Sequence, residues 1–108
     1  MDFNEYQRAT RSTAIYPRDM GAVYPALGLA GETGEVVDKI KKVIRDRNGE
    51  FDDESRLAIA HELGDVLWYI AAIAGDLGFD FDDIARMNVE KVLSRKARGT
   101  THGQGDNR

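Results

Sequence analysis

Apolar side chains recur every three or four positions through the middle of the chain, and this spacing limits the possible folds more than any other feature. Such a period marks one face of an α-helix. No segment alternates convincingly between apolar and polar residues, as a half-buried strand would. The sequence therefore predicts an all-α protein. The strongest stripe consists of Ile59, Leu63, Val66, Leu67, Ile70, Ile73, Ala74 and Leu77.

Start and stop signals divide the chain into four predicted helices. Aspartates that can cap a helix precede three of them, and a proline begins the remaining one. Glycines, once with a preceding asparagine, mark the ends. The predicted helices run from Asp2 to about Ser12, from Pro25 to Asn48-Gly49, from Asp52 or Asp53 to Gly78, and from Asp80 or Asp82 to about Arg98.

The length of 108 residues favours a single domain. A short loop joins the second and third helices, so these two should be antiparallel neighbours. We therefore predict an antiparallel four-helix bundle over residues 1–98, followed by a flexible polar tail over residues 99–108. The tail is either disordered or a lid whose basic residues reach a substrate. A bundle this small buries little apolar area, so we expect an oligomer.

Composition excludes several classes of protein. The chain has 15 lysine and arginine residues against 19 aspartate and glutamate residues, and its net charge of -4 argues against binding a nucleic-acid polymer. It has no cysteine, which rules out disulfides and zinc-cysteine sites. The first residues do not form a secretory signal, and we expect no segment long enough to span a bilayer. These features predict a cytoplasmic protein with no membrane partner.

An internal repeat carries two acidic pairs. A shift of thirty positions aligns the segment that starts at Glu32 with the segment that starts at Glu62, and it superimposes Glu35 on Asp65. Each pair borders the apolar stripe of its helix. Because the two helices should pack together, the four carboxylates can converge. A single pair of this kind is common on a solvated helix face, whereas two matched pairs on neighbouring helices predict a metal site.

Four clustered carboxylates need protons or cations to offset their repulsion, and oxygen ligands suit magnesium or manganese. Glycines 31, 34 and 64 lie beside the acids, and each costs helix stability relative to alanine, by about 1 kcal/mol. Ligand access or close helix packing would explain them. A non-catalytic helical module that binds a metal or a partner through the same acidic face remains the alternative. Carboxylate-bridged iron chemistry would require histidines that the pattern lacks.

The same acids carry a family resemblance. The sequence Gly31-Glu32-x-x-Glu35, followed by Glu62-x-x-Asp65, resembles the MazG-like all-α nucleoside triphosphate pyrophosphohydrolases, whose signature is E-x-x-E, a spacer and E-x-x-D. The resemblance implies magnesium-dependent hydrolysis of an NTP or dNTP to the monophosphate and pyrophosphate, in dimers or tetramers. It extends to Tyr6-Gln7, the run Gly28 to Glu32, Asp65-Val-Leu-Trp-Tyr, and a last helix with Asn88, Lys91 and Arg95.

In the resulting hypothesis Glu32, Glu35, Glu62 and Asp65 are both metal ligands and catalytic residues, and one of them activates a water. Basic side chains would neutralise the phosphates, although a solvated basic face explains the last helix equally well. Trp68 points away from the apolar stripe, which indicates either a dimer contact or a surface for a base. The predicted substrate ligands are Lys39, Trp68, Asn88, Lys91 and Arg95.

Overall fold

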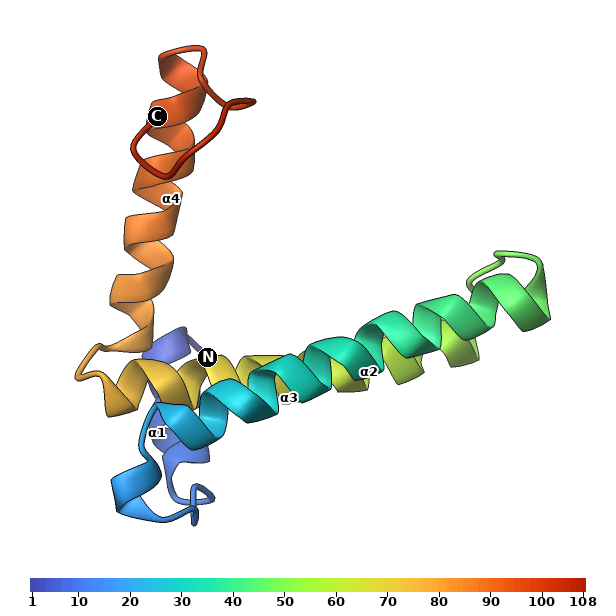
Figure 1. The fold of residues 1–108 in the computed structure, drawn as a ribbon, viewed down its shortest axis with the longest axis horizontal. Helices are drawn as coiled ribbons and strands as arrows, with labels where there is room; N and C mark the ends of the chain where they lie inside the picture. Colours follow the sequence, from blue (N-terminus) through green and yellow to red (C-terminus); the bar gives the residue numbers. More distant parts are fainter.

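The computed structural model describes residues 1–108 and contains helices and no strand. The all-α prediction is confirmed. Figure 1 shows two long helices lying side by side, with a short helix at one end and a fourth long helix rising from that end. The elements are α1 (Phe3–Arg11), the short 3-10 helix η1 (Arg18–Met20), α2 (Val23–Arg47), α3 (Asp53–Asp76) and α4 (Phe81–Ala97).

The predicted capping residues explain where the helices begin and end. The Asp2 carboxylate accepts the Glu5 amide at 2.7 Å, and the Asp52 carboxylate accepts the Ser55 amide at 2.8 Å. Asn48 is left-handed, with φ of 55°, and ends α2 as the sequence predicts. One boundary differs, because α2 begins at Val23 rather than at Pro25.

Hydrogen bonds to one carboxylate fix the loop that leads into α2. The Asp76 carboxylate, at the end of α3, accepts hydrogen bonds from the Ala22 amide at 2.9 Å and the Tyr16 hydroxyl at 2.6 Å. Arg11 pairs with the same carboxylate at 2.7 Å. Ala22 has a φ of 60°, a conformation that costs a non-glycine residue free energy. The hydrogen bond from the Ala22 amide to the Asp76 carboxylate therefore holds the start of α2 against the end of α3.

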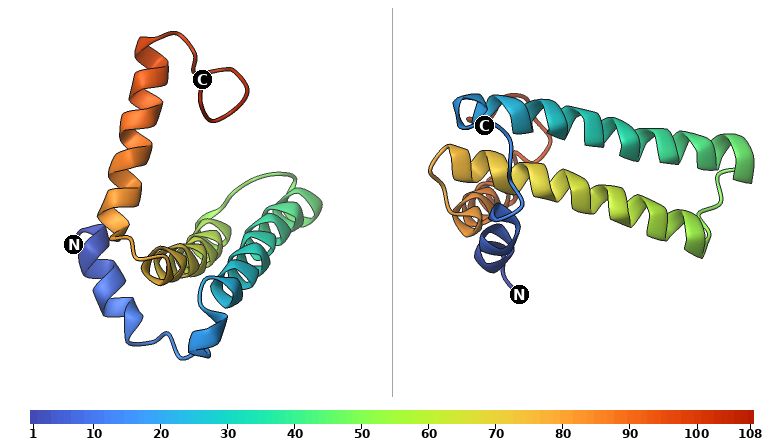
Figure 2. Two further views of the ribbon diagram at one scale, coloured as in Figure 1. Left: turned by 60° about the vertical axis from the view of Figure 1, so that its left-hand side comes forward. Right: turned by 90° about the horizontal axis from the view of Figure 1, so that it is seen from below.

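The α2–α3 hairpin is the best-packed part of the chain. The two helices run antiparallel along their whole length, as Figure 2 shows. Gly28 lets the Tyr69 ring of α3 pack against α2, because a Cβ atom at Gly28 would lie 2.1 Å from Cε1 of Tyr69. The aromatic ring thus occupies the space that a larger residue on α2 would need.

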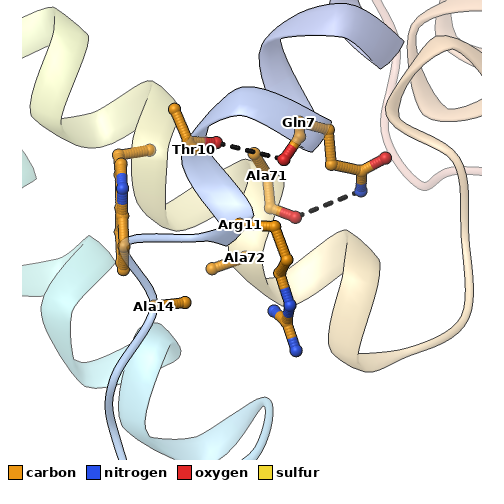
Figure 3. A pocket seen from close by; sticks show the side chains of 7 residues that line it. Gln7, Thr10, Arg11, Ala14, Ala71 and Ala72 are labelled. Carbon is orange, nitrogen blue, oxygen red and sulfur yellow. Dashed lines mark hydrogen bonds between the residues drawn. The ribbon is translucent and has the colours of Figure 1, made fainter.

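Helix α1 crosses α3 near its end and is held there by Gln7 (Figure 3). The Gln7 side-chain amide donates to the Ala71 carbonyl at 3.3 Å and to the Phe79 carbonyl at 3.1 Å, and its oxygen accepts the Phe81 amide at 3.1 Å. One side chain therefore ties together α1, α3 and the start of α4. Ala71 and Ala72 are buried at the crossing, where small side chains let α1 approach.

Helix α4 diverges from the hairpin, so a bundle of four parallel axes does not close within one chain (Figures 1 and 2). The first turn of α4 packs on α1: Phe81 stacks on Phe3 with ring centroids 4.5 Å apart, and the Asp82 amide donates to Asn4 Oδ1 at 2.9 Å. These contacts fix the direction of α4 away from α2. We call residues 81–108 the α4 arm. Its exposed apolar residues are Met87, Val89, Val92 and Leu93.

Helix α3 also corrects one sequence expectation. By length and composition it could cross a membrane, with a mean hydropathy of 1.4 in its most apolar window. The expectation that no segment reaches such a length was therefore wrong. In this structure α3 lies along α2 and carries Glu62 and Asp65, and 17% of its most apolar window is buried. Length and hydropathy alone are weak grounds for a membrane span.

Candidate metal centre

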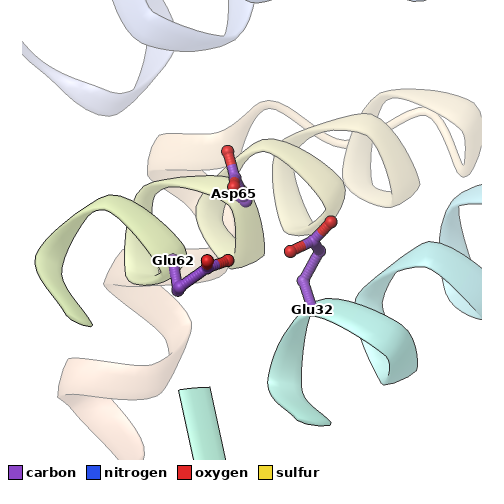
Figure 4. Close-up of side chains that lie close together, drawn as sticks. All are labelled: Glu32, Glu62 and Asp65. Atoms are coloured by element: carbon purple, nitrogen blue, oxygen red, sulfur yellow. The ribbon is translucent and has the colours of Figure 1, made fainter. Parts of the chain in front are cut away.

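Three of the four predicted carboxylates meet between the two helices of the hairpin. One oxygen from each of Glu32, Glu62 and Asp65 lies within 4.8 Å of the others. Figure 4 shows Glu32 reaching from α2 toward Glu62 and Asp65 on α3. Glu62 and Asp65 share a face because they lie three residues apart on a helix. Because the helices pack as antiparallel neighbours, the repeat brings its two acidic segments together.

The electrostatics of this acidic cluster favour a bound cation. Partial burial raises the pKa of the Glu32 carboxyl, and the nearby Asp65 and Glu62 carboxylates raise it further. Like charges this close disfavour simultaneous ionisation unless a cation offsets them. Carboxylate oxygens are the ligands that magnesium, manganese and calcium prefer. The donor set therefore fits a divalent metal ion.

Glu35 and Lys39 lie around the cluster on α2. Glu35 is exposed and falls outside the group of three converging carboxylates, so its role as a metal ligand stays a prediction. Lys39 Nζ lies 3.5 Å from Glu62 Oε1, where it partly offsets the negative charge. The sequence left open whether Lys39 pairs with Glu35. In the structure its acidic neighbour is Glu62, on the opposite helix.

A pocket of about 370 Å³ opens beside the cluster, lined by Glu32, Asp65, Thr13, Trp68 and Tyr69. Its aromatic wall is fixed, because Trp68 Nε1 donates to Thr13 Oγ1 at 2.8 Å and the Trp68 and Tyr69 rings meet edge to face at a centroid distance of 5.0 Å. Trp68 was predicted from the sequence, and the structure puts it at this pocket. Thr13 was missed because it lies in a loop with no regular spacing.

Tyr69 was also missed, although Gly28 offered a signal that some large residue packs against α2. Burial raises the pKa of its phenol, and Tyr24, Glu32 and Asp65 raise it further. A phenol is protonated at neutral pH in any case, so the Tyr69 hydroxyl has a proton that it can donate.

The predicted substrate ligands of the last helix lie elsewhere. Asn88, Lys91 and Arg95 are on α4, which extends away from the hairpin (Figure 1). Lys91 and Arg95 instead contact Asp106 of the C-terminal tail, at 2.8 Å and 3.1 Å. Within one chain the structure brings Lys39 and Trp68 to the acidic cluster and leaves the α4 residues apart from it.

The helical glycines separate into two groups. A Cβ atom at Gly31, Gly34 or Gly64 would meet no other atom within 4 Å. Close packing within the chain therefore does not explain these three, which leaves access for a ligand or packing against a second chain. Gly28 is the helical glycine that close packing requires.

Comparison with known proteins identifies the family. The MazG nucleotide pyrophosphohydrolase domain matches residues 25–99. The chain belongs to this family. The chain is also 41% identical over 114 residues to the Gene 37 protein of Mycobacterium phage L5, with both chains covered over their full length. No solved structure matches it.

The MazG match spans the residues that matter for the site. It covers all four predicted acids and the basic residues of α4, whereas α1 and most of the tail lie outside it. The phage relative has a name that states no activity. Family membership thus supports a nucleotide pyrophosphohydrolase.

Proposed function

We propose that this MazG domain is a magnesium-dependent hydrolase that converts a nucleoside triphosphate, ribo or deoxy, to the monophosphate and pyrophosphate. The observation that carries the proposal is the convergence of Glu32, Glu62 and Asp65 in a member of this family. A divalent ion held there would polarise phosphate oxygens and lower the pKa of a bound water. Manganese, with the same ligand preference, is an expected substitute.

In this proposal the four acids divide two tasks. Glu32, Glu62 and Asp65 hold the metal, and one of the four carboxylates, Glu35 included, orients and deprotonates the attacking water. The water oxygen forms a bond to the α-phosphorus while the bond from that phosphorus to the bridging oxygen breaks, so pyrophosphate leaves. Lys39 offsets charge on the phosphates from the rim of the cluster.

The surroundings of the cluster suggest which way the substrate lies. The cleaved bond joins the α- and β-phosphates, so the nucleoside and the pyrophosphate must extend from the metal in different directions. Trp68 and Tyr69 lie toward one end of the hairpin, whereas Lys39 lies about two turns from Glu32 toward the other end. We therefore place the nucleoside against the aromatic pocket, which suits stacking of a base, and the pyrophosphate near Lys39.

We further propose that the protein acts as a homo-oligomer, a dimer or a tetramer. One chain exposes 7793 Å², whereas a compact protein of its mass exposes about 6,000 Å². Its radius of gyration is 16.7 Å, against about 13 Å for a compact chain of this length. The excess surface is about 1,800 Å² per chain, which is within the range that obligate dimers bury. A second copy of this chain is the partner that we propose covers this excess surface.

An oligomer would also give Asn88, Lys91 and Arg95 a route to the phosphates. To reach the acidic cluster of its own chain α4 must swing toward the hairpin, whereas a second copy can present its α4 without that movement. We propose these residues as phosphate ligands on this basis. A small diffusible substrate also accords with the cytoplasmic location predicted from the sequence.

The decisive experiment is incubation of the full chain with canonical and modified nucleoside triphosphates, with and without magnesium, followed by assay of pyrophosphate. We expect magnesium-dependent release from at least one of them. Release from none would favour the alternative, a non-catalytic module that binds a metal or a partner. Release that persists undiminished in Glu62→Gln would contradict the assignment of the site.

A further inference from the structure

The C-terminal tail folds back along α4 instead of leaving the molecule (Figures 1 and 2). Gly99 turns the chain, with φ of 73°, and Gly105 turns it again, with φ of 82°. The Arg108 guanidinium closes the loop by donating to the carbonyls of Thr100, Thr101 and Gly105. The tail is thus a small closed loop held together by its own last residue.

One acidic side chain of this loop meets two cations of α4. Asp106 Oδ1 lies 2.8 Å from Lys91 Nζ and 3.1 Å from Arg95 Nη2. The Asp106 carbonyl accepts a second bond from Arg95 Nη2, at 2.6 Å. The Arg95 side chain is only 9% exposed, whereas that of Asp106 is 77% exposed. The cationic partner is therefore built into the arm, and the anionic partner lies at its surface.

The fit between these groups is incomplete. Arg95 Nε is buried and has no hydrogen-bond partner. A guanidinium binds an oxyanion best through two parallel N–H groups, and leaving a buried donor unsatisfied costs free energy. Asp106 uses a single carboxylate oxygen for both Lys91 and Arg95. A phosphate group carries more oxygens, so one group can bind Lys91 Nζ, Arg95 Nη2 and Arg95 Nε together.

We propose that residues 99–108 are a releasable strap: the Asp106 carboxylate occupies an oxyanion site formed by Lys91 and Arg95, and a phosphate group displaces it. The oxyanion site stands on its own contacts, and only the identity of its ligand as a nucleotide substrate or product rests on the proposed function. While the strap is closed, the two cations are neutralised. Binding of phosphate opens it and frees the tail.

The anionic side of the strap is suited to release. The Asp106 and Lys91 side chains are 77% and 38% exposed, so water and salt screen their ion pair, whereas the Arg95 side chain is 9% exposed. Displacement of Asp106 requires an anion that makes better use of Lys91 and Arg95, and opening of the whole tail also breaks the hydrogen bond from Arg98 to the Arg108 carbonyl. It needs no rearrangement of α4 itself, because the strap is joined to the helix at Gly99, where a glycine can change its backbone angles at little cost.

The test is the affinity of the full chain for inorganic pyrophosphate without metal, by calorimetry, in wild type, Asp106→Asn and Asp83→Asn. Asp83 pairs with Arg86 at the other end of α4, so its variant matches the charge change without touching the strap. We expect Asp106→Asn to bind about threefold to fivefold more tightly than wild type, because a single exposed competitor has been removed. Equal affinities of Asp106→Asn and Asp83→Asn would overturn the proposal.

A second measurement covers the opening of the strap and the source of the phosphate. Hydrogen exchange of residues 99–108 should accelerate when wild type binds pyrophosphate. Arg95→Lys keeps the positive charge but loses the paired N–H donors of the guanidinium, so it should bind pyrophosphate more weakly. Unchanged exchange on binding contradicts the strap. Repeating the titrations with a non-hydrolysable nucleoside triphosphate tells a nucleotide ligand from free pyrophosphate. Tighter binding by Asp106→Asn without any hydrolysis would uphold the strap while refuting the proposed function.

Discussion

The α2–α3 hairpin and the α4 arm both carry charged side chains at helical spacing, but the fold uses them differently. In the hairpin, acids from two helices face one another and form a site that a cation would complete. In the arm, Lys91 and Arg95 face the tail, and Asp106 neutralises them. The comparison teaches that like charges on one helix gather into a candidate metal site when a neighbouring helix places further like charges opposite them.

The largest expected effect contrasts one glutamate of each region. Glu62→Gln should lower kcat/KM by at least about 100-fold, because it removes a charge on which metal binding depends. Glu90→Gln is the matched control, since Glu90 lies on the arm and pairs only with Arg86, at 3.5 Å. We expect its pyrophosphate release to remain within about twofold of wild type. Similar losses of kcat/KM in both variants would contradict the assignment of the metal site to the hairpin rather than to the arm.

The second contrast concerns two aspartates that each bind an arginine. Asp76 is 6% exposed and Asp106 is 77% exposed. Asp76→Asn should lower the free energy of unfolding by about 2 kcal/mol, because charged hydrogen bonds to Arg11, Tyr16 and the Ala22 amide are weakened. Asp106→Asn should leave denaturant-induced unfolding unchanged within error. An equal loss in both would mean that the tail is as firmly fixed as the base of the hairpin.

The effect of Asp76 should also depend on pH. Burial would raise its pKa, but the Ala22 amide, Tyr16 and Arg11 together lower it below its ordinary value. A carboxyl with a depressed folded pKa stabilises the protein above its unfolded pKa of about 3.9, and this contribution disappears as the pH falls through the folded value. The stability difference between wild type and Asp76→Asn should therefore be constant near neutral pH and shrink below about pH 4.

The third contrast lies within α2 and tests the packing that aligns the acids. Gly28→Ala should destabilise the protein by about 1–3 kcal/mol, because its Cβ would clash with Tyr69. Gly31→Ala places a Cβ in open space and should stabilise the helix by up to about 1 kcal/mol. Thermal unfolding of both variants measures the difference. A destabilised Gly31→Ala would indicate that another chain covers this face.

The smallest effect is expected at the aromatic pocket. Trp68→Phe keeps a ring but loses the hydrogen bond to Thr13. We expect KM to rise by about threefold while kcat is unchanged, because a base stacks less well on a smaller and less fixed ring. Steady-state kinetics on the preferred nucleotide check this. A change in kcat with unaltered KM would contradict this role and indicate that Trp68 acts on the reacting phosphates instead of the nucleoside.

Much of the hairpin could be predicted from the sequence because its signals are local. The apolar period, the cap at Asp52 and the stop at Asn48 depend on neighbouring residues, and the repeat placed Glu32 opposite Glu62. The pocket could not be predicted in full, since Thr13 reaches Trp68 from a loop.

The course of the arm depends on distant contacts. Gln7 and Asn4 bind the first amides of α4 and so set its direction, which no spacing within α4 reveals. The predicted antiparallel bundle assumed that four helices joined by short loops pack side by side. The structure shows that the first turn of α4 packs on α1 instead, which leaves the basic residues of α4 apart from the acids.

The central claim, that Glu32, Glu62 and Asp65 form a divalent-metal site, is tested most directly by titrating the protein with Mn²⁺ and measuring free ion by electron paramagnetic resonance. We predict saturable binding by wild type and by Glu90→Gln, and a loss of at least about tenfold in affinity in Glu62→Gln and Asp65→Asn. Equal Mn²⁺ affinity in all four proteins would contradict the claim, whatever the activity measurements show.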